Sequence, residues 1–145
     1  AVSANSQTCR LITPLTRLPF QGEGGSLQEG LADTLTALQL DNPNIGEASY
    51  KDGPYQRTLI NSLRYDEKRG QLYHDSLILS GLIWEIRQRA GADTAIDLTR
   101  FLLAHLSPIG NFESVRTQIG EWMKQAPDQD KTKMVDAVLK ERGWS

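Results

Sequence analysis

The chain has 145 residues, of which 39% are hydrophobic and 23% charged, and its net charge is −2. This length and apolar content predict one domain with a core of its own. The small net charge argues against nucleic acid and anionic membranes as partners, and no run approaches the roughly 18 apolar residues of a membrane span. The single cysteine, Cys9, excludes an internal disulfide.

Helical periodicity dominates the first part of the chain. We expect a helix over 2–12, after which Pro14 and Pro19 break the chain. A second helix is expected over 26–40 and ends at the turn-forming residues 41–46. Its apolar residues step by four, four and three positions: Leu27, Leu31, Leu35 and Leu38.

The middle of the chain has a weaker pattern. Residues 46–72 predict an irregular loop, with a turn signal at 51–54 and a short helix near 55–63. A sheet is not expected, because runs of Val, Ile and aromatic residues that alternate at a period of two are missing.

Regular helical spacing returns in the second half of the chain. One helix is expected over 75–90, and Gly91 ends it. Asp93 is expected to cap the next helix, which reaches about His105.

Two further helices complete the prediction. Asn111 is expected to cap the first of them, and Pro127 to lie in the first turn of the last, which runs to about Arg142. Trp84, Trp122 and Trp144 fit helix faces and indicate packing. The fold class predicted for 1–145 is therefore a single all-α domain of five to seven helices.

Two carboxylates, Glu29 and Asp33, lie four residues apart in the predicted 26–40 helix and therefore share a face. Such a pair can provide a metal ligand and a second carboxylate that orients another ligand. The alternative is structural, because Ser26-x-x-Glu29 is also a capping-box sequence and Asp33 could be a solvated charge. On spacing alone the structural interpretation is favoured.

The two histidines and the cysteine are also candidates. His74 lies at a predicted helix start, where it could donate a hydrogen bond to an oxyanion, although a residue flanking a cap is the more common case. His105 is interpreted as a packing residue or a cation at a helix C-terminus. Cys9 is interpreted as a small buried hydrophobic residue rather than a nucleophile.

Five segments of the chain form an ordered set of motifs: 2–9, 23–33, 44–47, 73–76 and 106–112. Together they resemble the C-terminal helical lobe of the thermolysin-like zinc metallopeptidases. The first stands where that family has its H-E-x-x-H helix. The others resemble its E-S-G-x-x-N-E-x-x-x-D helix, the loop that follows it, its V-H-x-N-S segment and its L-T-P-x-x-N-F link.

The resemblance assigns roles to three residues. Glu29 stands at the third zinc ligand, Asp33 at the carboxylate that orients a ligating histidine, and His74 at the histidine that stabilises the tetrahedral oxyanion. The resemblance also implies an N-terminal β-rich lobe that forms the other wall of the cleft. We therefore expect the chain to be the C-terminal lobe of a longer protein, secreted or periplasmic like most of the family.

Four positions depart from the family pattern. Asn5 and Cys9 stand at the two ligating histidines, Ser6 at the general-base glutamate, and Phe20 at about the place of a tyrosine that contacts the oxyanion. A catalytic zinc needs about three protein ligands, and only Cys9 and Glu29 are left. Without the metal and the base, water is neither acidified nor deprotonated.

These departures predict a catalytically inactive pseudopeptidase domain with no bound metal or cofactor, which binds a protein or peptide partner or serves a structural role. The missing N-terminal lobe is one possible partner. The alternatives are an active hydrolase with a non-standard site made of Cys9, Glu29 and His74, a fragment of a zinc peptidase, and a plain helical interaction domain.

Overall fold

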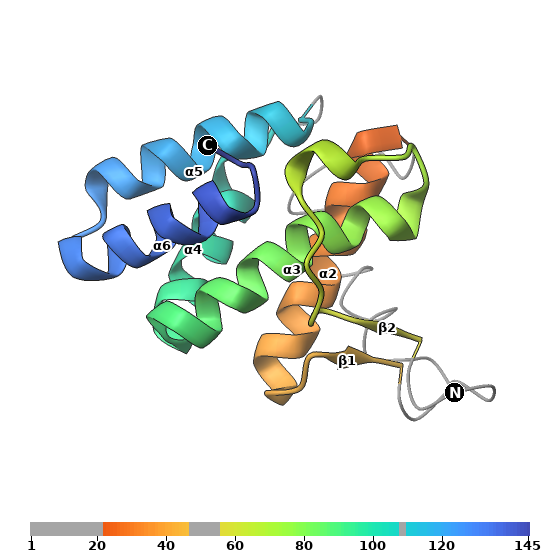
Figure 1. Cartoon of the computed structure of the whole chain (residues 1–145), viewed down its shortest axis with the longest axis horizontal. Helices are drawn as coiled ribbons and strands as arrows, with labels where there is room; N and C mark the ends of the chain where they lie inside the picture. Colours follow the sequence, from red (N-terminus) through yellow and green to blue (C-terminus); the bar gives the residue numbers. More distant parts are fainter. Residues whose placement is uncertain (1–21, 47–55, 108–109) are drawn as a thin grey trace.

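The computed structural model describes residues 22–46, 56–107 and 110–145 (Figure 1). The helix expected over 2–12 lies outside the described residues. Within them the fold is all-α, as predicted. The five α-helices are α2 (Gly22–Leu40), α3 (Leu72–Ala90), α4 (Ala92–His105), α5 (Phe112–Gln125) and α6 (Gln129–Glu141).

A short β-ladder departs from the prediction that no strands would form. Strand β1 (Asn44–Ile45) pairs antiparallel with β2 (Arg57–Thr58), with Asn44 opposite Thr58. Two-residue strands are too short to show alternation in the sequence, and the pairing joins segments on either side of a loop. The described part of the predicted 55–63 helix is not helical. A 3₁₀ helix, η1, follows instead at Tyr65–Glu67.

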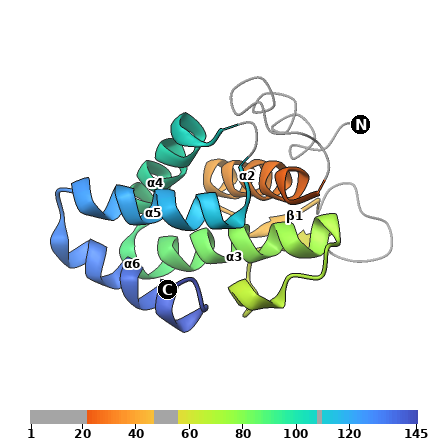
Figure 2. The ribbon, with the colours of Figure 1, turned by 90° about the horizontal axis from the view of Figure 1, so that it is seen from above.

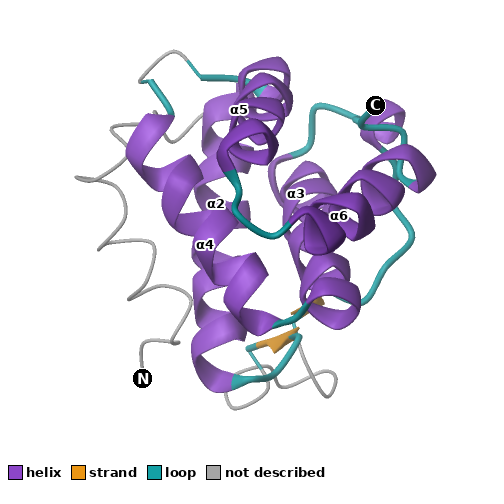
Figure 3. Cartoon of the chain, turned by 90° about the vertical axis from the view of Figure 1, so that its left-hand side faces the viewer, coloured by secondary structure: helices purple, strands orange, loops and turns teal. Residues whose placement is uncertain are grey.

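Helices α2 and α3 pack along each other and form the centre of the domain (Figures 1 and 2). A glycine allows this close approach: a Cβ on Gly30 would lie 2.9 Å from the backbone oxygen of Ser76. Helix α4 contacts both central helices, α6 packs on α3, and α5 packs on α4 (Figure 3).

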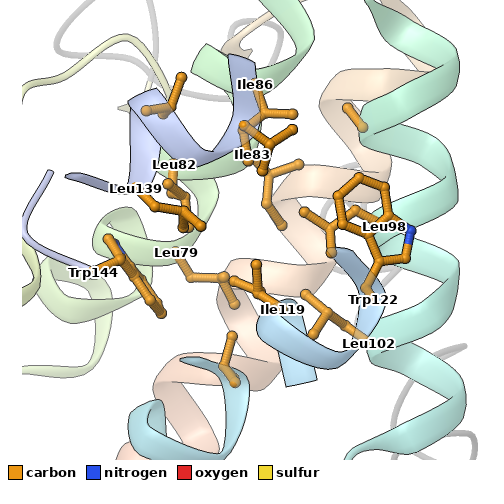
Figure 4. Close-up of a cluster of buried hydrophobic side chains, with 14 of the residues drawn as sticks. Leu79, Leu82, Ile83, Ile86, Leu98, Leu102, Ile119, Trp122, Leu139 and Trp144 are labelled. Atoms are coloured by element: carbon orange, nitrogen blue, oxygen red, sulfur yellow. The ribbon is translucent and has the colours of Figure 1, made fainter. Parts of the chain in front are cut away.

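One large hydrophobic cluster joins all five helices (Figure 4). Trp122 of α5 and Trp144, which follows α6, lie at its two sides, and a smaller cluster contains Trp84. All three indoles are at most 5% exposed, which confirms that they are packing residues. No helix in the described ranges has both the length and the apolar character needed to cross a membrane.

Helix α2 begins four residues earlier than predicted, at Gly22. Glycine has a low helix propensity, but Gly24 and Gly25 are buried, so packing overrides propensity here. Ser26 is consequently inside the helix. Its hydroxyl donates to the backbone oxygen of Leu72 (3.0 Å) and caps nothing, so the capping-box interpretation of Ser26 and Glu29 is wrong.

The structure confirms most of the predicted helix ends and corrects the starts of α4 and α6. Gly91 ends α3 at φ +101°, Asn111 caps α5 by accepting from the Ser114 amide, and α6 ends at the residue before Arg142. Asp93 is not the cap of α4, because Gly91 occupies that position, and it lies instead in the first turn. Pro127 precedes Asp128, the true cap of α6.

Candidate functional site

The side chain of Arg57 lies between the two carboxylates that the sequence singled out. Its Nε donates to Asp33 Oδ2 (2.9 Å) and its Nη2 to Asp33 Oδ1 (3.0 Å), a bidentate pair. Nη2 also lies 3.8 Å from Glu29 Oε1. Asp33 is 0% exposed, so its interpretation as a solvated charge is wrong.

The turn after α2 and the β-ladder bring these three residues together. Glu29 and Asp33 lie one turn apart on the buried part of α2, and β1 follows α2 after a short turn. Strand β2 pairs with β1 and returns Arg57 toward α2, with Ile45 directly opposite Arg57. The ladder that the sequence analysis did not expect is therefore the element that positions the cation.

Burial works against the charge on Arg57, but the interactions with its partners outweigh it. The hydrogen bonds and charge of Asp33, and then the charge of Glu29, raise the pKa of Arg57 above its ordinary value. Arg57 is thus cationic at any physiological pH. Its guanidinium carbon also lies 4.7 Å from the ring centroid of Tyr73, which is 40% exposed, so the aromatic ring covers part of the buried charge cluster.

The next residue, His74, lies in the first turn of α3 and is held by its neighbour. Its Nδ1 lies 2.8 Å from Oδ1 of Asp75. The same buried carboxylate accepts the backbone amides of Arg69 and Gly70, both at 2.9 Å, so its position is fixed. Asp75 therefore orients His74, and its place next to His74 in the sequence was the signal that could have identified it.

The pairing with Asp75 defines what His74 can offer a ligand. A carboxylate only accepts hydrogen bonds, so Nδ1 carries the proton that is donated to it. The other nitrogen, Nε2, is buried and has no hydrogen-bond partner in the structure that is described. In the neutral ring Nε2 accepts a hydrogen bond, and in the protonated ring it donates one.

The structure brings two of the predicted site residues, Glu29 and Asp33, together through Arg57, whereas His74 is linked to this group only by its chain neighbour Tyr73. Glu29 and Asp33 contact Arg57, Arg57 contacts Tyr73, and Tyr73 precedes His74 in α3. The other positions singled out by the resemblance lie outside the described residues: Asn5, Ser6, Cys9 and Phe20.

His105 is not part of this cluster. It is the last residue of α4 and is exposed, and its ring stacks on Phe101 at 3.9 Å between centroids. Its Nδ1 lies 2.8 Å from the Phe101 backbone oxygen. A place at the helix C-terminus agrees with the interpretation from sequence.

The described residues offer few groups of side chains that could hold a metal ion. Within residues 22–46, 56–107 and 110–145, no three histidine, cysteine or acidic side chains are placed to hold a metal ion together. Arg57 supplies one positive charge next to the two buried carboxylates, Glu29 and Asp33, and offsets part of their negative charge.

The cluster of Glu29, Asp33, Arg57, Tyr73 and His74 is named the guanidinium site below. Comparison of the chain with protein-family models and with curated proteins found no match.

Proposed function

We propose that this chain is a catalytically inactive, metallopeptidase-like domain of the thermolysin type that binds a protein or peptide segment at the guanidinium site. The proposal combines the ordered motif resemblance with the chemistry of the residues at the site. The observation that carries it is the bidentate contact of Arg57 with Asp33, together with the approach of the same guanidinium to Glu29.

That contact offsets part of the negative charge of the buried carboxylates without a catalytic metal. Two negative charges taken out of water need compensation, and Arg57 provides one positive charge, at 2.9 Å from Asp33 and 3.8 Å from Glu29. The positions that would complete a zinc site carry Asn5, Ser6 and Cys9 in the sequence. Asparagine is a poor zinc ligand, and serine cannot serve as the general base.

Two features of the same region support peptide binding. Nε2 of His74 is buried without a partner among the described residues and can bond to a peptide N–H or C=O, depending on its protonation. The exposed part of the Tyr73 ring, beside it in the sequence, offers an apolar surface. An extended peptide could place its main chain against His74 and one of its side chains against Tyr73.

The experiment uses the fact that the chain has two histidines, His74 and His105. Pools of capped tetrapeptides are titrated into the ¹⁵N-labelled protein, and the ring nitrogen signals of both residues are followed. We expect some pools to shift the His74 signals and leave those of His105 unchanged. If no pool at millimolar concentration moves His74, or if both histidines respond alike, peptide binding at this site is rejected.

The second candidate function is a hydrolase with Cys9 as nucleophile. The observation in its favour is the Asp75–His74 pair, in which a buried carboxylate orients a histidine that has an unpartnered nitrogen. A base of this kind would activate Cys9 as a thiolate. Iodoacetamide should then alkylate Cys9 much faster than a free thiol at pH 6, and His74→Ala should abolish the difference. Alkylation at the rate of a free thiol would reject this alternative.

A further inference from the structure

A small hollow lies between the first two turns of α4, the end of α5 and the start of α6. It has a volume of about 160 Å³, and Trp122, Ala126 and Pro127 give it an apolar lining. A second hollow of about 280 Å³ adjoins it across Asp97 and Trp122. Pockets for drug-sized ligands measure about 300–1,000 Å³, so the first hollow is suited to a single side chain.

The two hollows together form one groove, which is separate from the guanidinium site. No residue of that site lines either hollow. The groove lies where α5 turns into α6, near the C-terminal end of α3, whereas His74 and Tyr73 lie in the first turn of α3 (Figure 1). A ligand bound here would leave the proposed function untouched.

Most hydrogen-bond donors that line the groove are already engaged. The hydroxyls of Thr94 and Thr132 donate to backbone oxygens one turn earlier, at 3.1 and 2.9 Å. The indole Nε1 of Trp122 donates to Asp97 Oδ2 at 2.9 Å. The charged donors that remain are Lys131 in the first hollow and Arg100 in the second.

The acceptors, in contrast, are largely unused. Asp93 makes no side-chain hydrogen bond or ion pair within the described structure, and Asp97 keeps a second oxygen. Asp128 faces them from α6 and uses only Oδ1 to cap that helix. Three carboxylates thus line the first hollow against one ammonium group, that of Lys131.

The spacing of two of these carboxylates also favours a bound cation. Asp93 and Asp97 lie four residues apart and therefore share a face of α4, where like charges repel. A cation placed between them relieves that repulsion. The groove is therefore complementary to a group that combines positive charge, several donors and a flat or apolar body.

We propose that this groove binds the arginine side chain of a protein or peptide partner. A guanidinium can direct its N–H groups to Asp93 and the free oxygen of Asp97, beside the small exposed part of the Trp122 ring. Its aliphatic stem can pack on Pro127. Lysine offers the charge but not the planar fork, so arginine is preferred.

The test uses the full 145-residue chain and three capped peptides: acetyl-Ala-Arg-Ala-amide and its lysine and citrulline counterparts. Citrulline has the shape of arginine without the charge. Binding is followed by the Trp122 indole N–H signal, assigned with Trp122→Phe. We expect the arginine peptide to shift this signal in a saturable way and the citrulline peptide to bind about two- to fivefold more weakly.

Two variants with the same change in charge distinguish binding at the groove from attraction to the overall charge of the protein. Asp93→Asn removes a carboxylate that lines the groove. Asp130→Asn removes a carboxylate in the first turn of α6 that does not line the groove. Asp93→Asn should weaken binding about two- to fivefold, and Asp130→Asn should have little effect. Both residues are exposed, so both variants should fold, and thermal unfolding checks this.

Three results would overturn the proposal. The first is no shift of the Trp122 signal at any accessible concentration of the arginine peptide. The second is equal binding of the citrulline peptide, which would leave an apolar pocket without charge recognition. The third is equal weakening by Asp93→Asn and Asp130→Asn, which would show attraction to the overall charge of the protein.

Discussion

Arg57 donates two hydrogen bonds to Asp33, at 2.9 and 3.0 Å, across 24 residues of chain. This buried pair joins the β-ladder to α2 and shapes the guanidinium site. Removing one member of a buried ion pair leaves an uncompensated charge and typically costs about 3–5 kcal/mol. The pair is therefore expected to dominate the local stability of the site.

The first prediction concerns this pair. Asp33→Asn should lower the free energy of unfolding by about 3 kcal/mol or more, measured by urea denaturation. Asp136→Asn is the matched control, because it breaks an exposed i,i+4 pair with Lys140 and should cost less than about 0.5 kcal/mol. Equal losses in the two variants would show that the Arg57–Asp33 pair contributes no more to the free energy of unfolding than an exposed pair.

The second prediction concerns the approach of α2 to α3. Gly30→Ala places a Cβ 2.9 Å from a backbone oxygen of α3 and should destabilise the protein by about 1–3 kcal/mol. In Gly120→Ala the new Cβ meets nothing within 4 Å, and the higher helix propensity of alanine should stabilise α5 by about 0.5–1 kcal/mol. Effects of the same sign in the two variants would contradict the packing described for Gly30.

Tyr65 gives the third prediction, on pH. Burial and then the hydrogen bond to Glu113 raise the pKa of Tyr65 above its ordinary value near 10. The folded state therefore favours the protonated phenol. Its contribution to stability is complete below about pH 10 and is lost as the pH rises through the higher folded value. Tyr65→Phe should accordingly reduce the fall in unfolding free energy above pH 10, and identical slopes for both proteins would contradict the shift.

The fourth prediction compares two residues that the sequence analysis assigned as caps. Asn111 accepts the Ser114 amide at 2.9 Å, so Asn111→Ala should cost about 1 kcal/mol. Asp93 lies within the first turn of α4 and caps nothing, so Asp93→Ala should cost only the macrodipole contribution, about 0.3–1 kcal/mol at low salt. A larger loss for Asp93 than for Asn111 would reverse this assignment.

Local signals made the helices predictable. Apolar spacing located α3 to α6 within a few residues, and Gly91 and Asn111 marked real boundaries because their effects act within one turn. The start of α2 was missed for the opposite reason: Gly24 and Gly25 are poor helix formers that tertiary packing holds in a helix.

The composition of the guanidinium site was only half predictable. Glu29 and Asp33 stand out by their spacing on one helix, and His74 by its place at a helix start. Arg57 could not be found, because its carboxylate partners lie 24 or more residues away and a two-residue strand brings it to them. Asp75 was adjacent to His74, but only the structure gives the 2.8 Å contact between them.

The most direct test of the central claim is the zinc content of the chain after incubation with excess zinc and removal of the loosely bound metal. The account predicts far less than one equivalent per chain and no peptide hydrolysis. Asn5→His, Ser6→Glu and Cys9→His, combined in one variant, should raise zinc binding toward one equivalent. One tightly bound equivalent in the unaltered chain, lost in Glu29→Gln and accompanied by peptide cleavage, would contradict the account.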